Sequence, residues 1–480
     1  MSAMIRLLAA AMAMARVALA ADADGQGVTG AQADKMPPAG FRRLVFTKDY
    51  FPGTNDCNGN WSGGTETMEL RAHGGKLFAS LGYWMDMPYG QPKGREPWTG
   101  AQVLVKESAD GPWRVDVSFG PGYLRTEALA EVTFTTDALG ALLPAPVTLL
   151  VAGPGDVSVA GARWATAWAR DDVTGRWAKS DIALEPRAAG ARSFAAHRDK
   201  VTGIHHIFAG VACGQIYRGV YDPAAAGRIR WSAEPELSGT GRPMCMTEAD
   251  GVLYAACGIK DGTPQSGGLF RRRDGAQPKW EMVYRWPCNL AVRSSDELRI
   301  LRGLTAVADT QGDGHAVLLA TRNFGGVIER IDPAKNFAVT RELNIRDFFA
   351  KMWGVAVYRG PALSAYNRFV PAADPATGEK IHLVGVAVKH PKTAALSQDN
   401  AYFLVRCEDG HYEGLEIVDP DHPFPGVAGL EGTRAIEVSP FPEDRGRVFY
   451  FGGHDCIYSN SHNTAWIYKG KLQAPKMGKP

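Results

Sequence analysis

The sequence predicts an all-β fold, a seven-bladed β-propeller of four-stranded antiparallel blades, and three observations lead to this prediction. Short alternating or β-branched segments are separated by Gly, Pro and Asp turns along nearly the whole chain, whereas helical periodicity is almost absent. Similar segments recur at intervals of roughly fifty to seventy residues. The 480 residues include 55 glycines and 12 tryptophans, which suits many short strands and tight turns. Two separate β-sandwiches are the alternative.

The N-terminal segment predicts export. Arg6 precedes the apolar run LLAAAMAMA, and Ala18-Leu19-Ala20 forms an A-x-A cleavage site. We therefore expect a signal peptide at 1–20, a flexible segment at 21–40, the propeller at 41–470 and a C-terminal tail at 471–480. A first helix of the folded domain is the alternative for 1–20. An exported chain is periplasmic or secreted, where disulfides persist.

Each blade is expected to contain an inner strand, two apolar strands and an outer strand. The second strands are predicted at 76–84, 146–153, 204–212, 251–258, 315–322, 380–388 and 447–453. The third strands are predicted at 101–108, 165–171, 214–222, 267–274, 325–332, 400–409 and 464–470. The seventh blade has no outer strand at its C-terminal end. We expect segment 41–48 to supply that strand and to close the ring, which removes exposed sheet edges.

Four turns place an aspartate shortly before an aromatic residue: SADGPW at 108–113, DVTGRW at 172–177, DGAQPKW at 274–280 and DGHY at 409–412. We expect these turns to lead into outer strands and Trp113 to pack between neighbouring sheets. These turns resemble degenerate Asp-box turns of sialidase-like secreted propellers. Sialidase activity does not follow from the resemblance, because the sequence offers no convincing set of three arginines with a Tyr/Glu pair. In architecture and export the chain also resembles propeller lyases that cut uronate-containing polysaccharides with His, Tyr and Arg.

The cysteines fit the predicted blades in three pairs. In each pair, one cysteine lies between the second and third strands of a blade and the other lies where the chain enters the next blade. The predicted disulfides are Cys213–Cys245, Cys257–Cys288 and Cys57–Cys456, with Cys407 left as a buried thiol. Unbonded buried thiols are the alternative for each pair.

Candidate site residues come from the long loops 55–64, 82–98, 344–369 and 452–463, which we place on one face of the propeller. Elimination at a uronate needs a base, a cation for the carboxylate and an acid for the leaving oxygen. The candidate catalytic residues are His454, His462, Tyr366 and Arg302. The candidate substrate-binding residues are Trp61, Trp84, Asp86, Arg95, Arg368 and Asn463. Hydrogen bonds that merely hold the 452–463 loop are the alternative role for Asp455 and His462.

Other polar features are assigned structural roles. The segment DTQGDG at 309–314 predicts a hairpin turn, with a calcium loop as the alternative. His197 is expected to make structural hydrogen bonds. His205 and His206 are adjacent on a strand, so their side chains point to opposite faces and do not form a metal pair.

The functional expectation is an exported enzyme acting on an extracellular glycan, including uronate-containing ones, by lyase or hydrolase chemistry. A non-catalytic propeller that binds a ligand or partner protein is the first alternative, and a metal-dependent lactonase or esterase is the second. The net charge is +2 and no basic run is longer than RRR at 271–273, which argues against nucleic-acid binding. We expect a monomer without a membrane span. The substrate, the bond broken and any metal requirement stay open.

Overall fold

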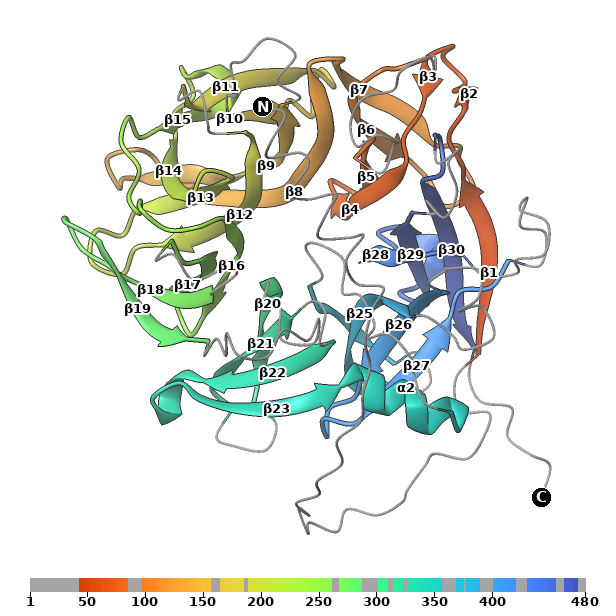
Figure 1. Cartoon of the computed structure of the whole chain (residues 1–480). Coiled ribbons are helices and arrows are strands. Elements are labelled where there is room, and N and C mark those ends of the chain that lie inside the picture. Colours follow the sequence, from red (N-terminus) through yellow and green to blue (C-terminus); the bar gives the residue numbers. More distant parts are fainter. Residues whose placement is uncertain are drawn as a thin grey trace, which may run out of the picture. The chain divides into compact units, whose positions relative to one another are not determined.

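The structure is a computed structural model of the whole chain (Figure 1). It describes residues 43–84, 97–156, 165–184, 189–260, 267–286, 301–309, 314–322, 326–355, 368–374, 377–388, 400–419, 430–454 and 462–473. All of them belong to one compact unit, Arg42–Pro480. No helix among the described residues is long and apolar enough to cross a membrane.

Nearly all regular structure in the described residues is β-strand, and four antiparallel sheets follow the chain order (Figure 1). The first contains β12 (Ala191–Arg198), β13 (His205–Val211), β14 (Gln215–Tyr221) and β15 (Ile229–Trp231). The second contains β16 (Pro243–Ala249), β17 (Val252–Gly258), β18 (Gly267–Arg273) and β19 (Lys279–Arg285). The third contains β20 (Leu301–Ala308), β21 (Ala316–Arg322), β22 (Val327–Asp332) and β23 (Ala338–Asn344). The fourth contains β24 (Val370–Ala373), β25 (Lys380–Val388), β26 (Asn400–Arg406) and β27 (Tyr412–Glu416).

An eight-stranded sheet precedes these four and combines two units that the sequence predicts as separate blades. Its strands are β4 (Glu66–His73), β5 (Lys76–Gly82), β6 (Ala101–Lys106), β7 (Arg114–Gly120), β8 (Tyr123–Thr136), β9 (Leu142–Asp156), β10 (Ala165–Arg170) and β11 (Trp177–Ala183). The two halves join at a single pair, Gly82 opposite Arg125. A Cβ at Gly82 would lie 2.0 Å from the Cβ of Arg125, so only glycine permits this approach.

The N-terminal strand completes the last sheet, as predicted. This sheet has the order β1 (Arg43–Tyr50), β30 (Trp466–Gln473), β29 (Val448–Gly453) and β28 (Thr433–Val438). Strands β1 and β30 are antiparallel, with Arg43 opposite Gln473. Each predicted second and third strand is also found in a sheet. The second strands β5, β13, β17, β21 and β29 are buried on both faces, which explains their continuous apolar runs.

The first strands of most successive four-stranded units contact one another. Strand β4 contacts both β8 and β28, strand β12 contacts both β8 and β16, and β16 also contacts β20. Strand β24 contacts β28, and one apolar cluster joins the sheets of β20 and β25 through Val307, Val317, Val384 and Val386. The hydrophobic core therefore lies between successive sheets.

One helix replaces the beginning of the loop predicted at 344–369. Helix α2 (Ile345–Trp353) begins after Asn344, whose side chain accepts hydrogen bonds from the backbone N–H groups of Arg346 and Asp347. It ends at Gly354, whose φ of +67° is easily adopted by glycine. Ile345 and Phe349 are buried in the cluster shared by the β20 and β25 sheets. The prediction missed this helix because its single apolar face spans only nine residues.

The aromatic residues of the Asp turns tie neighbouring four-stranded units together, and Trp113 does so as predicted. Trp113 Nε1 donates to Asp49 on β1 at 2.6 Å, and Trp177 Nε1 donates to Asp116 on β7 at 2.7 Å. Trp280 and Tyr412 make the same kind of bond to Glu236 and Glu342. A cation from the third strand binds each of these carboxylates as well: Lys106, Arg170, Arg272 and Arg406. The aspartate of SADGPW, Asp110, is an exposed turn residue.

Replacing Trp113 with phenylalanine should lower the free energy of unfolding by about 1–3 kcal/mol, because it removes a buried hydrogen bond and leaves a small void. Urea denaturation followed by circular dichroism measures this change. The matched control is Trp84→Phe, at a ring that is 40% exposed, which should change the unfolding free energy by about 0.5 kcal/mol or less. Equal effects of the two substitutions would show that the Trp113 bond does not stabilise the fold.

One predicted disulfide is not formed in the structure. The thiol of Cys213 donates a hydrogen bond to Gln215 Oε1 at 2.8 Å, and Cys245 is a free thiol. Instead, Cys245 lies close to Cys257, and burial raises the pKa values of both thiols. The pairs Cys257–Cys288 and Cys57–Cys456 are not formed either, because Cys257 and Cys57 are free thiols; Cys288 and Cys456 themselves lie outside the described residues. Cys407 is buried.

Candidate functional site

A β-bulge interrupts the same region of six first strands. Strand β4 illustrates it: Thr67 pairs with Leu81 and Glu69 with Ser80, so Met68 is an extra residue. The corresponding extra residues in β8, β12, β16, β20 and β28 are Glu127, Arg192, Met244, Arg302 and Arg434. A bulge redirects the side chain of its extra residue and is common beside active sites.

Several bulged side chains meet one another. Met68 and Met244 form one buried apolar cluster, although they belong to different sheets. Arg434 Nη1 lies 2.9 Å from the Met68 sulfur, and Arg192 Nη1 donates to Glu127 Oε1. The bulges therefore bring residues far apart in the sequence to one place.

The central charge cluster, as we name it, consists of Glu66, Arg125, Glu127, Arg192, Arg434 and His454. Arg125 connects its two carboxylates: Nη1 lies 3.4 Å from Glu66 Oε1, and Nε lies 2.5 Å from Glu127 Oε1. Arg434 Nη1 binds the other oxygen of Glu66. All six residues are buried, and Glu66 is completely so.

The cluster carries an excess of positive charge. Burial alone would raise the pKa of Glu66, but Arg434 and Arg125 hold that pKa below its usual range, so Glu66 is ionised. Burial, and then the charge of Arg434, lower the pKa of His454 to about 3, so His454 is neutral. Among the six residues that define the cluster, three arginines therefore face two glutamates, which is a formal sum of one positive charge. Such an excess in a buried place favours an anionic ligand.

Glycine holds His454 in this position. His454 pairs with Glu66 through an isolated β-bridge, and its carbonyl oxygen accepts a hydrogen bond from Trp466 Nε1 at 3.1 Å. The imidazole lies against Gly432, where a Cβ would be only 2.4 Å from His454 Cε1. The backbone of Gly432 also has a positive φ of 30°. A side chain at position 432 would displace the imidazole.

Glu127 Oε2 and His454 Nδ1 are two of the buried polar atoms of the cluster that have no hydrogen-bond partner among the described residues; Arg434 Nε is another. Both contacts to Glu127 use its other oxygen. Buried polar atoms in native proteins are usually paired with protein, water or ligand. Glu127 Oε2 and His454 Nδ1 are therefore available for hydrogen bonds to a hydroxyl-bearing molecule.

A second charged group lies further along the first strands. Two arginines, Arg71 and Arg368, contact two carboxylates, Glu69 and Glu437, and the closest contact is 3.3 Å from Arg368 Nη2 to Glu437 Oε2. Burial raises the pKa of Glu69 to about 7, assisted by Glu437 and opposed by Arg368. Arg71, Arg368 and Glu437 line a cavity of about 310 Å³. A carboxyl group with this pKa can hold a proton near neutral pH.

The structure distributes the predicted site residues over several places. His454 is in the central charge cluster, Arg302 is the bulge residue of β20, and Arg368 belongs to the second charged group. The half-exposed ring of Trp84 lies 4.6 Å from the guanidinium carbon of Arg125, which connects the cluster to the surface. Tyr366, Asp86 and Arg95 lie outside the described residues.

The remaining predicted residues support a loop near Gly64. His462 stacks on Tyr83 with ring centroids 5.5 Å apart, and Asn463 Oδ1 accepts a hydrogen bond from the Gly64 N–H at 3.2 Å. The Trp61 carbonyl accepts a hydrogen bond from Gln102 Nε2 at 2.9 Å. His462 and Asn463 thus contact residues near the start of the first sheet.

Sequence reasoning missed most of the central charge cluster, and it found no convincing set of three arginines. A usable signal was present: an arginine recurs near the start of first strands in LRTEA, ARSFA, LRGLT and TRAIE, at Arg125, Arg192, Arg302 and Arg434. Their convergence depends on the bulges, which have no recognisable sequence pattern here.

Two groups of described residues have atoms close enough to hold a metal ion: Asp309, His315 and Asp332, and Cys407, His411 and Glu413. The first lies beside the 309–314 segment that predicts a turn or a calcium loop. Arg330 pairs with Asp309 at 2.6 Å and Lys335 with Asp332 at 3.0 Å, so protein cations already neutralise these carboxylates. Neither group includes a residue of the central charge cluster. No protein-family model matches the chain, and no curated protein matches it.

Proposed function

We propose that the chain is a seven-bladed β-propeller whose ring is closed by β1. Three observations support this arrangement. The four-stranded units follow one another along the chain, with contacts between most of their successive first strands, and β4 in the first unit contacts β28 in the last. The Asp-turn bonds link the unit that ends in β1 to the next, because Trp113 reaches Asp49. In a propeller, the central charge cluster would lie in the central channel.

We propose that this propeller is an exported enzyme that acts on an extracellular uronate-containing glycan by lyase chemistry. The observation that carries this proposal is the excess of three arginines over two glutamates in the central charge cluster. A uronate carboxylate would neutralise that excess, and guanidinium groups bind carboxylates well. The sugar hydroxyls would satisfy Glu127 Oε2 and His454 Nδ1. Trp84 offers an exposed ring beside Arg125 on which a sugar can pack.

The chemistry follows from the charge balance. In β-elimination a base takes the proton α to the carboxylate, a carbon–carbon double bond forms, and the bond to the leaving oxygen breaks. The leaving oxygen keeps the electron pair of that bond and takes up a proton from water. Arginine stabilises the negative charge that develops on the carboxylate during proton removal. Neutral His454 can accept the proton. Its low pKa makes it a weak base in the empty site, but a bound carboxylate offsets Arg434 and raises that pKa toward a useful value.

Purified protein incubated with polygalacturonate or alginate should release unsaturated products, which are measured by ultraviolet absorbance. His454→Gln should lower the initial rate by about 100-fold or more, because it removes the base. The matched control is His411→Gln, at an exposed histidine paired with Asp409, which should keep the rate within about twofold.

The outcomes separate the possible functions. Absence of product from the wild-type protein with every uronate polymer would overturn the lyase proposal. Binding of those polymers without product would indicate a non-catalytic propeller. Release of reducing ends without ultraviolet absorbance would indicate a hydrolase, for which Glu69, with its pKa of about 7, is the candidate acid.

A further inference from the structure

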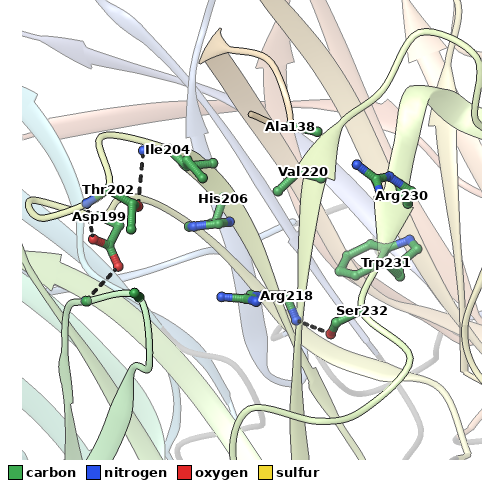
Figure 2. A pocket seen from close by; sticks show the side chains of 12 residues that line it. Ala138, Asp199, Thr202, Ile204, His206, Arg218, Val220, Arg230, Trp231 and Ser232 are labelled. Carbon is green, nitrogen blue, oxygen red and sulfur yellow. Dashed lines mark hydrogen bonds between the residues drawn. The ribbon is translucent and has the colours of Figure 1, made fainter. Parts of the chain in front are cut away.

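A separate cavity of about 300 Å³ lies on the sheet of β12–β15, away from the central charge cluster. Its lining includes Asp199, Ile204, His206, Arg218, Arg230 and Trp231. Figure 2 shows His206 near the middle, with Arg218 below it and Arg230 and Trp231 on the far side. Neighbouring strands β13, β14 and β15 therefore provide one polar side chain each.

His206 is the most informative residue of this cavity. Its side chain is buried, with 3% of the residue exposed, and Nδ1 has no hydrogen-bond partner among the described residues. A buried imidazole nitrogen without a partner costs free energy unless a water or a ligand satisfies it. Because His206 lines the cavity, a molecule bound there can approach its ring.

The cavity also presents two arginines with spare hydrogen-bond donors. Arg218 Nη1 lies 3.7 Å from Glu236 and Arg230 Nε lies 3.1 Å from Asp222, so each guanidinium has an ion pair at its edge. Their side chains are 40% and 58% exposed, and a guanidinium carries five N–H groups. Both arginines can therefore bind a further oxyanion.

The acidic residue of the cavity is already neutralised. Asp199 Oδ1 accepts hydrogen bonds from the N–H groups of Val201 and Thr202, while Oδ2 binds Arg272 and the Gly275 N–H. Both carboxylate oxygens of Asp199 are therefore already hydrogen-bonded, so neither faces an incoming anion without a donor to neutralise it. Burial lowers the pKa of His206 to about 4, and the positive charges of Arg272 and Arg218 and the nearby His197 contribute to this decrease. Asp199 acts in the opposite direction. The local potential at this ring is positive.

We propose that this cavity is a second ligand site that binds a small organic oxyanion of sugar-acid size. Arg218 and Arg230 would bind the carboxylate, and His206 Nδ1 would exchange a hydrogen bond with a hydroxyl or carboxylate oxygen. Trp231, Val220 and Ile204 form an apolar wall for the carbon skeleton. The volume lies at the lower end of the range of small-molecule pockets, which suits one monosaccharide acid and excludes a polymer segment. This proposal does not depend on lyase activity at the central charge cluster.

The test measures glucuronate binding by calorimetry and by the NMR shift of the His206 Hε1 proton, assigned with His206→Gln. Glucuronate should bind and should raise the pKa of His206 by at least one unit, because a bound anion stabilises the imidazolium. Glucose should not bind. Sulfate should bind more weakly than glucuronate, since it cannot pack on Trp231.

Variants locate the site. Arg218→Gln should weaken glucuronate binding at least tenfold and should raise the pKa of His206 in the absence of ligand, because one positive charge is removed. The control Arg198→Gln removes an exposed cation of the same sheet that does not line the cavity, and it should change the affinity less than twofold.

Two results would overturn the proposal. One is glucuronate binding that is equally strong in wild type and Arg218→Gln while the His206 signal does not move. The other is the absence of any binding. Arg434→Gln alters the central charge cluster and should leave glucuronate binding in this cavity unchanged. A failure of the cavity proposal is therefore distinguishable from a failure of the lyase proposal.

Discussion

Replacing Glu66 with alanine should lower the free energy of unfolding by about 3–5 kcal/mol, which is a large share of the stability of a typical domain. Glu66 is completely buried and binds Arg434 and Arg125. Its removal leaves Arg434 without a carboxylate in a buried place and increases the excess positive charge of the cluster. Desolvated guanidinium groups without a counterion are the physical cause of the loss.

Urea denaturation of wild type and Glu66→Ala measures this loss. The matched control is Glu107→Ala, because Glu107 also binds two cations, Lys76 and Arg114, but does so at the surface. Surface ion pairs of this kind contribute about 0–1 kcal/mol to the free energy of unfolding. If Glu66→Ala cost no more than Glu107→Ala, the central charge cluster would not be a network of buried ion pairs.

Replacing Arg272 with alanine should cost a similar amount, about 3–5 kcal/mol at neutral pH. The Arg272 side chain is completely buried, and it binds Glu236 through Nε at 2.6 Å and Asp199 and Asp274 through Nη1. It also lies over the ring of Phe208 at 5.2 Å. Its loss leaves three carboxylates facing one another without the cation that joins two sheets.

The cost of Arg272→Ala should depend on pH in a defined direction. Burial would raise the pKa of Asp199, but backbone hydrogen bonds, with Arg272, hold it well below the usual 3.8. A carboxyl group with a depressed pKa stabilises the fold above its unfolded pKa, and this contribution is lost as the pH falls through the folded pKa. Without Arg272 the neighbouring carboxylates of Asp199, Glu236 and Asp274 have higher pKa values, so they take up protons at a higher pH as the solution is acidified. The difference in unfolding free energy between wild type and Arg272→Ala should therefore be smaller at pH 4 than at pH 7.

The neighbouring residue provides the control. Arg273→Ala removes an arginine that is 61% exposed and pairs with Glu281. It should change the unfolding free energy by about 0–1 kcal/mol at every pH. A pH-independent difference for Arg272→Ala would contradict the assignment of Arg272 as the partner of ionised Asp199.

Much of the fold could be predicted because the signals are local. Alternating apolar residues between turn residues identify a strand wherever they occur, and the repeated Asp turns mark the start of outer strands. The pairing of β1 with β30 was predictable because an unassigned strand at one end matched a missing strand at the other. His197 also has the structural role expected for it, since it binds Glu248 and Asp274.

The errors arise where long-range geometry decides the outcome. Cys213 and Cys245 occupy the predicted places along the chain, but the Cys213 thiol donates a hydrogen bond to Gln215 and Cys245 lies beside Cys257. A disulfide requires its two Cβ atoms to be about 3.5–4.5 Å apart, and sequence position does not determine that distance. His454 and His462 are eight positions apart in one segment, yet only His454 contributes to the central charge cluster.

By itself, the sequence determined the β-strands, their order, the Asp turns and the strand that completes the last sheet, since all of these follow from local patterns of polarity and turn residues. Only the tertiary structure decided which polar residues meet. One-residue bulges rotate Glu127, Arg192 and Arg434 from three sheets toward one another, and Gly82 and Gly432 permit the close approach of Arg125 and His454. A bulge shifts every later residue of its strand by one position, so its effect on side-chain direction cannot be derived from an alternating pattern.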